Sequence, residues 1–247
     1  MLKNIYIGTS GWSYKDWKGL FYPPELKSTE WLTFFSNTFK ITEINSSFYH
    51  LPLKKTVTGW VNKVPADFKF CPKISRYLTH IKRLKDAEEP LERFFSVFSP
   101  MKDKMGPVLV QLPPSLKFDS GLAQEFYKIL HSKYNDYSFA LEARHESWLQ
   151  KDSLKLMGDY DIAFVVAQSG KGFPYAEVVT AKNIYVRFHG PKELYASSYS
   201  DSMLADFAGR FKKWHKAGHI IWAFFNNDYY GYAINNGLKL INMLQAG

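Results

Sequence analysis

The stretch 139–145 reads Phe-Ala-Leu-Glu-Ala-Arg-His, and its alternating side chains decide the fold. In an extended strand Phe139 and Leu141 point to one face, whereas Glu142 and Arg144 point to the other. A charged side chain inside a strand is unfavourable unless it is paired or functional, so the charged face needs a special environment. In a parallel barrel that environment is the interior near the carboxyl ends of the strands, while the apolar face packs against helices.

Short runs of β-branched or aromatic residues, bounded by turn residues, recur along the whole chain and predict eight strands. Stretches with apolar residues three to four positions apart predict helices between most of them. The expected strands are Ile5–Thr9, Ile41–Asn45, Phe68–Lys73, Val108–Leu112, Ser138–Arg144, Ala163–Gln168, Ile184–His189 and Ile220–Asn226. The expected helices are Thr29–Asn37, Thr56–Lys63, Leu91–Lys102, Gly121–Ser132, Ser147–Gly158, Met203–Ala217 and Gly237–Leu244.

Strands that alternate with helices indicate an α/β fold of parallel strands joined by right-handed crossovers. Eight of them fit a (β/α)8 TIM-like barrel, and without a linker or repeat we expect a single domain over residues 1–247. A doubly wound open sheet is the alternative, but the turn Gly8–Trp12 lacks the GxGxxG spacing typical of that fold. The segment Gln168–Asn183 is short and contains glycines and a proline, so the sixth crossover is expected to lack a helix.

The chain is basic and rich in aromatic residues. It has 32 Lys and Arg against 23 Asp and Glu, a formal net charge of +9, and 17% aromatic residues. The excess of positive charge favours an anionic ligand. The aromatic content suggests that this ligand has rings that stack on aromatic side chains, as the bases of a nucleic acid do. The plainer interpretation is that lysines on solvated helix faces supply most of the charge.

The single cysteine, Cys71, excludes an intramolecular disulfide and a cysteine-based zinc ribbon. We therefore expect a reducing, cytoplasmic setting. The segment Met1–Asn4 leads directly into the first strand, so no signal peptide is expected. No run of about 18 apolar residues occurs, so no transmembrane helix and no membrane partner are expected.

Two other predicted strands end in charged residues, as the stretch 139–145 does. The second strand carries Glu43, and the seventh carries Arg187 and His189 in phase. Convergence of such groups at the carboxyl-end mouth of a barrel predicts a site for a polar, anionic ligand. The alternative is a set of internal ion pairs in which Glu142 binds Arg144 or Arg187.

The first functional hypothesis is an enzyme, such as a phosphoester hydrolase, that acts on an anionic small molecule or a nucleic acid. Arginine and lysine hold phosphate, glutamate serves as general base, and imidazole serves as general acid. Aromatic rim residues, Tyr14 among them, stack on bases or sugars. The candidate catalytic residues are Glu43, Glu142, His145 and His189. The candidate ligand-binding residues are Ser10, Trp12, Asn45, Phe48, Tyr49, Lys69, Lys73, Gln111, Arg144, Trp148, Arg187, Asn226 and Asn227.

Three alternatives to this hypothesis remain open. Zinc or manganese could bind the glutamates and histidines, although the spacing is not typical of a metal site and two arginines would repel the cation. Glu43 and Glu142 could hydrolyse or rearrange a sugar as a carboxylate pair. The chain could also be a non-catalytic module that binds nucleic acid or protein through surface residues such as Lys212 and Lys213. No Walker or dinucleotide motif occurs, so no cofactor is expected.

Short motifs follow one another in order over nearly the whole chain. They are Gly8–Tyr14 with Trp17 and Phe21–Pro23, Glu43–Tyr49, Phe68–Phe70 with Pro72–Lys73, Gln111–Pro114, Glu142–His145 with Ser147–Trp148, Tyr185–Gly190 and Phe225–Asn227. In this series the sequence resembles the YecE-like family, domain of unknown function number 72. The resemblance implies a (β/α) barrel of about this length and implies no activity. Ala143 and Asp228 depart from the family pattern, where Phe and His are more usual.

Overall fold

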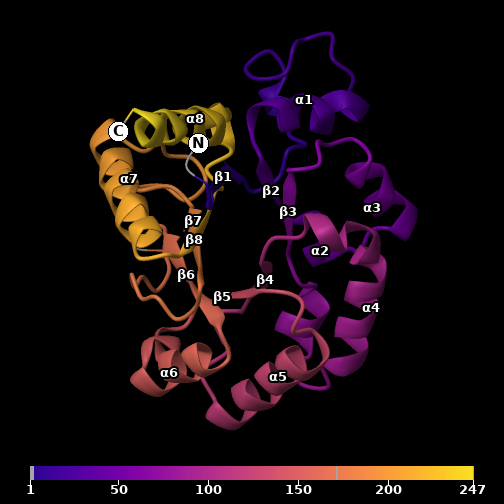
Figure 1. Cartoon of the computed structure of the whole chain (residues 1–247), viewed down its shortest axis with the longest axis vertical. Helices are drawn as coiled ribbons and strands as arrows, with labels where there is room; N and C mark the ends of the chain where they lie inside the picture. The colour runs from indigo at the N-terminus through magenta and orange to yellow at the C-terminus, as the bar shows by residue number, and fades with distance from the viewer. Residues whose placement is uncertain (1–2, 171, 247) are drawn as a thin grey trace.

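Eight parallel strands curl into a nearly closed barrel in the computed structural model, within residues 3–170 and 172–246, which it describes (Figure 1). This arrangement confirms the predicted (β/α)8 TIM-like barrel over the open doubly wound sheet. Residues 1–2, 171 and 247 lie outside the described residues, and so does the start of the segment considered for a signal peptide. The strands are β1 (Ile5–Thr9), β2 (Ile41–Ile44), β3 (Lys69–Pro72), β4 (Val108–Gln111), β5 (Phe139–Glu142), β6 (Ile162–Gln168), β7 (Asn183–Phe188) and β8 (Ile220–Phe225).

The strand order around the barrel is β3-β2-β1-β8-β7-β6-β5-β4, and each neighbouring pair is parallel. The two ends of this order, β3 and β4, meet through single bridges such as Lys73 to Leu109 rather than through a continuous ladder. We call this join the seam. Because Lys73 follows β3 and Gln111 ends β4, the seam reaches the carboxyl-end mouth of the barrel.

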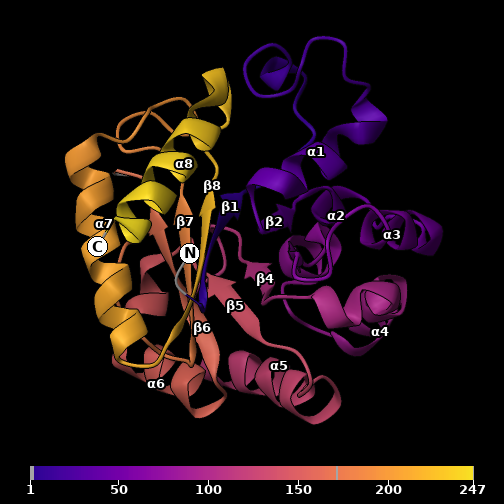
Figure 2. The ribbon, with the colours of Figure 1, turned by 45° about the horizontal axis from the view of Figure 1, so that its top comes forward.

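Helices pack around the outside of the barrel, as Figures 1 and 2 show. The helices α5 and α7 begin where a side-chain oxygen of Asp119 or Ser200 accepts an N–H of the first turn. The helices are α1 (Trp31–Thr38), α2 (Ser46–Tyr49), α3 (Lys54–Val61), α4 (Glu88–Phe98), α5 (Ser120–Lys133), α6 (Lys151–Asp159), α7 (Asp201–Lys216) and α8 (Tyr232–Gln245).

The crossover between β6 and β7 has no helix within its described residues, 169–170 and 172–182, which confirms the expectation for the sixth crossover. The helix α8 is longer than the expected Gly237–Leu244, because its first turns contain Asn236. That side chain interrupts the apolar pattern but is buried and bonded to Asn227. No described helix is both long enough and apolar enough to cross a membrane.

Apolar side chains form two separate layers, one between the strands and the helices and one inside the barrel. In β5 the outward Leu141 belongs to the first layer, and the inward Ala140 belongs to the second. The interior layer contains small residues, such as Ala140 and Ala163, beside large ones, such as Trp222. Above it, at the carboxyl ends of the strands, the interior positions become polar, and these positions form the candidate site.

Strands β1 and β2 approach each other closely at Gly8, which pairs with Ile41. A Cβ atom at this position would lie 2.0 Å from the carbonyl oxygen of Ile41. Real Cβ atoms do not approach a backbone oxygen so closely, so the barrel accepts only glycine here without a shift of the backbone.

Candidate functional site

A buried guanidinium joins two buried carboxylates below the mouth of the barrel. Arg187 of β7 donates from Nε and Nη2 to the two carboxylate oxygens of Glu43 in β2, both at 2.8 Å. Its Nη1 donates to Oε2 of Glu142 in β5, also at 2.8 Å. All three side chains are at most 2% exposed. The alternation of side chains along each strand brings these three residues into the barrel interior, as the sequence pattern indicates.

Glu142 accepts hydrogen bonds from four donors, two on each oxygen. Oε1 accepts from Nη2 of Arg144 at 3.0 Å and from Nε2 of His189 at 2.8 Å. Oε2 accepts from Nε2 of Gln111 and from Nη1 of Arg187. An ionised carboxylate has about four lone-pair sites, so this acceptor is saturated. Burial opposes the ionisation of Glu142, but the two arginines and His189 outweigh burial and hold its pKa well below the usual range.

Glu43 is saturated in the same way. Besides the two bonds from Arg187, it accepts from the Tyr185 hydroxyl at 2.9 Å and from Nδ2 of Asn45 at 3.4 Å. Burial raises its pKa, but the Arg187 guanidinium reverses that effect, so the pKa of Glu43 lies below the usual range. Both glutamates are therefore ionised and fully hydrogen-bonded, and neither has a free lone pair with which to accept a substrate proton.

His189 links the network to the mouth as a neutral ring. Burial lowers the pKa of His189 to about 4, although Glu142 works in the opposite direction. In the neutral ring Nε2–H donates to Glu142, and Nδ1 accepts from Nδ2 of Asn226 at 3.0 Å. Both ring nitrogens are thus in use, and His189 positions other groups rather than offering a free acid or base.

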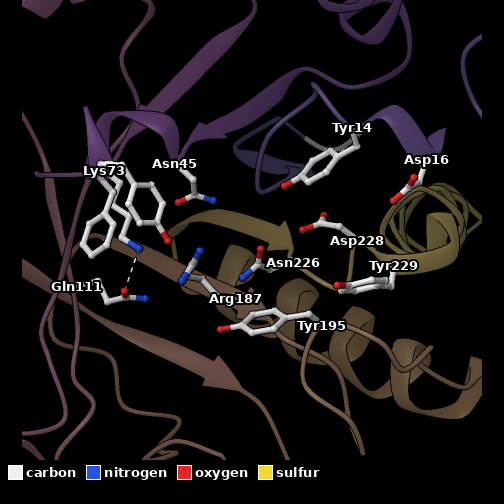
Figure 3. A pocket seen from close by; sticks show the side chains of 12 residues that line it. Tyr14, Asp16, Asn45, Lys73, Gln111, Arg187, Tyr195, Asn226, Asp228 and Tyr229 are labelled. Atoms are coloured by element: carbon white, nitrogen blue, oxygen red, sulfur yellow. Dashed lines mark hydrogen bonds between the residues drawn. The ribbon is translucent and has the colours of Figure 1, made fainter. Parts of the chain in front are cut away.

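An open cavity lies above this network, at the carboxyl ends of the strands (Figure 3). We call it the mouth cavity; its volume is about 540 Å³, within the range of small-molecule sites. Seven of the sequence-predicted ligand-binding residues line it: Asn45, Phe48, Tyr49, Lys73, Gln111, Arg187 and Asn226. Five further residues complete the lining: Tyr14, Asp16, Tyr195, Asp228 and Tyr229.

Lys73 is the cation on one side of the mouth cavity. Its side chain is 7% exposed, its Nζ donates to Oε1 of Gln111 at 2.9 Å, and its Nζ lies 4.0 Å from the centre of the Phe48 ring. None of the salt bridges among residues 3–170 and 172–246 involves Lys73. Burial, reinforced by the nearby Arg187, lowers the pKa of Lys73 to about 7.

Asp228 is the corresponding carboxyl on the opposite side of the cavity (Figure 3). It follows β8, and its Oδ1 is buried without a hydrogen-bond partner among the described residues. Burial raises the pKa of Asp228 to about 8, and the nearby carboxylate of Glu43 adds to the effect. Asp228 and Lys73 are thus an acid and a base that both change charge near neutral pH, which is typical of functional sites.

A second cavity of about 440 Å³ adjoins the mouth cavity, and Asn45 and Tyr14 line both. Ser10, Trp12 and Glu43 are the other sequence-predicted residues on its wall. The structure therefore separates Ser10 and Trp12 from Lys73 and groups them in a neighbouring hollow.

Seven candidates line neither cavity. Glu142, Arg144 and His189 belong to the buried network, and the other four lie outside it. Lys69 begins β3, at the end of the strand opposite to the mouth, and donates to the Asp103 carbonyl. The His145 ring accepts from the backbone of Ser147 at the start of a short helical turn.

The other two candidates of this group are buried. Trp148 is 1% exposed and donates to the Leu116 carbonyl, so it is a core residue and not a rim residue. Asn227 is fully buried and bonds to the loop carbonyl of Ser197. Asn227 faces away from Asn226 because consecutive residues point in opposite directions at a strand end.

The two arginines expected to hold phosphate are occupied by ion pairs. Arg187 and Arg144 both bind Glu142, and the Arg144 guanidinium also stacks on the Phe173 ring at 3.2 Å. The internal ion-pair alternative therefore describes these side chains. Arg187 nevertheless lines the mouth cavity, and three of its five N–H groups account for the bonds to the glutamates.

Sequence reasoning missed four lining residues: Asp16, Tyr195, Asp228 and Tyr229. For Asp228 a signal existed, because it closely follows a predicted strand on the side where barrel sites form. Tyr195 lies in the loop after β7 with a φ of +66°, a backbone conformation that its sequence context does not indicate. Loop residues of this kind reach a site through chain folding that periodicity does not record.

No three His, Cys, Asp or Glu side chains within residues 3–170 and 172–246 gather so that they could hold a metal ion. Of the proposed metal ligands, Glu43, Glu142 and His189 are engaged with N–H and O–H groups or with the Asn226 amide. His145 is bonded to Ser147 instead.

The sequence and fold are similar to those of several proteins. The UPF0759 protein YunF of Bacillus subtilis is 26% identical over 97% of this chain and 94% of its own length. The UPF0759 protein YecE of Escherichia coli K12 is 26% identical over 60% of this chain and 51% of its own length. The crystal structure of a DUF72 family protein from Thermotoga maritima MSB8 covers 98% of this chain and 99% of its own, with 31% identity and a TM-score of 0.86.

A DUF72 family protein from Enterococcus faecalis V583, 21% identical over 98% of this chain and 95% of its own, shares the fold with a TM-score of 0.83. The family model described as protein of unknown function DUF72 matches residues 6–247. The barrel, the order of the motifs along it and this match agree, and the chain belongs to the DUF72 family.

Proposed function

We propose that the protein is an enzyme that binds a small phosphate-bearing molecule in the mouth cavity and transfers a proton at the far end of that molecule. Lys73 is the contact for the phosphate, and Asp228 is the group that exchanges the proton. The observation that carries the proposal is the position of Lys73, a buried cation that lines the cavity without a carboxylate partner among the described residues.

Electrostatics support an anion at Lys73. Burial disfavours the charged ammonium and Arg187 disfavours it further, while the carboxylates of Glu142 and Glu43 only partly offset these effects. A bound phosphate would supply the missing counter-charge and return the amine to its charged form. The spare N–H groups of Arg187 and the neighbouring amide of Gln111 line the same part of the cavity and suit phosphate oxygens.

The phosphate is a handle in this proposal and not the reacting group. Asp228 lies on the side of the cavity opposite to Lys73, with Arg187 between them (Figure 3). A carboxyl whose pKa is near 8 is protonated at neutral pH and is able to give or take a proton there. Glu43 and Glu142 are saturated, which disfavours both the phosphoester hydrolysis and the carboxylate-pair sugar chemistry expected from the sequence.

Titration calorimetry with inorganic phosphate and ethyl phosphate tests the proposal. Lys73→Met removes the charge at similar length, and we expect it to weaken the binding of both ligands about tenfold or more. Lys54→Met, on the exposed start of α3, is the matched control and leaves the affinity unchanged. Native protein that binds neither ligand at millimolar concentration, or a Lys73 variant with native affinity, contradicts the proposal.

A second candidate function is the binding of single-stranded nucleic acid, favoured by exposed tyrosines on the rim of the mouth cavity. Tyr49 is 72% exposed and Tyr229 is 58% exposed, and ring faces of this kind stack on bases. This candidate predicts oligonucleotide affinity that falls steeply with salt and is lost in a Tyr49→Ala/Tyr229→Ala double variant. Affinity that depends on Lys73 and not on this surface pair favours the small-molecule enzyme.

A further inference from the structure

The side of the mouth cavity opposite to Lys73 is built to accept hydrogen bonds and positive charge. Figure 3 shows Asp228 there, with Asp16 and the rings of Tyr14 and Tyr229 around it. No salt bridge among the described residues involves Asp16 or Asp228. Two carboxyl groups without a cation lie next to exposed or half-buried tyrosine rings. The ring quadrupoles attract a cation, and Asp228 adds its negative charge once its proton has left.

Unsatisfied acceptors support the same conclusion. Oδ1 of Asp228 and Oδ1 of Asn45 are both buried, and both lack a hydrogen-bond donor among the described residues. Both residues line the mouth cavity. A buried acceptor without a donor is unfavourable. Protein atoms cover both oxygens, so a ligand N–H group reaches them only when the side chain turns towards the cavity, and that turn satisfies the acceptor.

Lys73 and Asp228 do not neutralise each other. Arg187 lies between them in the cavity wall, and its charge is already balanced by Glu43 and Glu142. Each end of the cavity is therefore left with one uncompensated group, a base at one end and an acid at the other. The raised pKa of Asp228 and the lowered pKa of Lys73 reflect burial without a counter-charge.

We propose, building on the proposed function, that the ligand of the mouth cavity is a phosphorylated amine whose phosphate binds Lys73 and whose ammonium group binds Asp228. A zwitterion of this kind compensates both ends of the cavity at once. A plain phosphate ester leaves Asp228 and the free acceptors unpaired. A ligand with a second anion brings that charge towards Asp16 and Asp228, which opposes binding.

The proton on Asp228 gives the ammonium group a specific signature. Before binding, the carboxyl is protonated at pH 7; beside an ammonium its ionised form is favoured, so the proton leaves for solvent as the ion pair forms. The Asp228 carboxylate is then hydrogen-bonded to the ammonium of the ligand.

Two matched probes test the inference: phosphoethanolamine and ethyl phosphate, which differ by one ammonium group. We expect native protein to bind phosphoethanolamine about tenfold more tightly at pH 7. In Asp228→Asn the two affinities become equal, because the carboxylate that pairs with the ammonium group is gone. Asp152→Asn, on the exposed first turn of α6, keeps the native ratio. Calorimetry in buffers of different ionisation enthalpy reports the proton released with phosphoethanolamine but not with ethyl phosphate.

The outcomes separate this inference from the proposed function. Equal affinities in native protein, with binding of both esters still dependent on Lys73, overturn the ammonium site and leave the phosphate site standing. A preference for phosphoethanolamine that survives in Asp228→Asn overturns the assignment to Asp228. Absence of binding by either ester overturns the proposed function and the inference together.

Discussion

Arg187 donates two parallel hydrogen bonds to Glu43, from Nε to Oε1 and from Nη2 to Oε2, each 2.8 Å long. This bidentate geometry holds the guanidinium plane in one orientation. The same plane then points Nη1 at Glu142 on the other side of the barrel. The pair therefore fixes the floor of the mouth cavity, while the chemistry that we propose belongs to the side chains above it.

Removing one partner of this network is expected to be strongly destabilising. Glu142→Gln leaves the buried Arg187 and Arg144 without their shared counter-charge, at a cost of about 3–5 kcal/mol in the free energy of unfolding. Urea denaturation followed by circular dichroism measures the loss. Glu88→Gln removes an exposed ion pair with Lys133 and is expected to change stability by less than about 1 kcal/mol. Similar losses in the two variants would show that the buried network adds no stability.

Acid is expected to destabilise the barrel through His189. The folded pKa of about 4 lies below the unfolded value of 6.5, so between these pH values the unfolded chain binds the proton and the folded chain does not. The stability that His189 contributes is therefore fully present above pH 6.5 and falls towards pH 4 by about 1 kcal/mol per pH unit. In His189→Gln this contribution disappears, whereas the contribution of His80, whose pKa burial also lowers to about 4, remains. Denaturant melts at pH 7, 6 and 5 measure the slopes, and equal slopes in both proteins contradict the assignment.

Lys73 is expected to make the free energy of unfolding depend on pH in the alkaline range. Its folded pKa of about 7 lies below the unfolded value of 10.5, so the unfolded chain binds more protons between these values. The contribution of Lys73 to stability then rises with pH from 7 to 10.5 by about 1 kcal/mol per pH unit. Lys73→Met lacks this rise, and the difference between the native and variant unfolding free energies at pH 7, 8 and 9 isolates it. A difference that does not change with pH would falsify the lowered pKa.

The close packing of β1 against β2 is tested by an alanine substitution at Gly8, with the same substitution at Gly59 as the control. Gly8→Ala places a Cβ atom 2.0 Å from the Ile41 carbonyl oxygen, and we expect a loss of more than about 3 kcal/mol. Gly59→Ala lies in α3 with no atom within 4 Å of the new Cβ, and it is expected to stabilise the protein by about 0.5–1 kcal/mol. Thermal melts of both variants check the pair. Tolerance of alanine at Gly8 would mean that β1 and β2 move apart at little cost.

The alternation of side chains predicted much of this arrangement from sequence. It placed Glu43, Glu142 and Arg187 in one interior because each falls on the charged face of its strand, and the structure shows them bonded to one another. It offered the pairing of Glu142 with Arg144 or Arg187 only as an alternative, and it did not reveal that Arg187 also binds Glu43. That result depends on distances across the barrel between strands far apart in the chain, such as β2 and β7.

The cavity lining was predicted where it comes from strand ends and missed where it comes from loops. Lys73 and Asn226 follow β3 and β8 directly, so their position was readable from the strands. Tyr195 and Tyr229 come from the loops after β7 and β8, and a backbone hydrogen bond joins those two loops. His145 lies one residue beyond the charged face of its strand, so its ring points away from the network and bonds to Ser147 instead.

The seam between β3 and β4 makes the proposed ligand site and the weakest join of the barrel the same place. Few backbone hydrogen bonds cross the seam, and a side-chain hydrogen bond from Lys73 to Gln111 joins its two strands. A phosphate that draws Lys73 away from Gln111 breaks this hydrogen bond, whereas a phosphate that binds both side chains strengthens the join between the two strands. The rate of amide hydrogen exchange along residues 69–73 and 108–111 therefore reports whether the ligand is bound, because binding changes how often the barrel opens at its mouth.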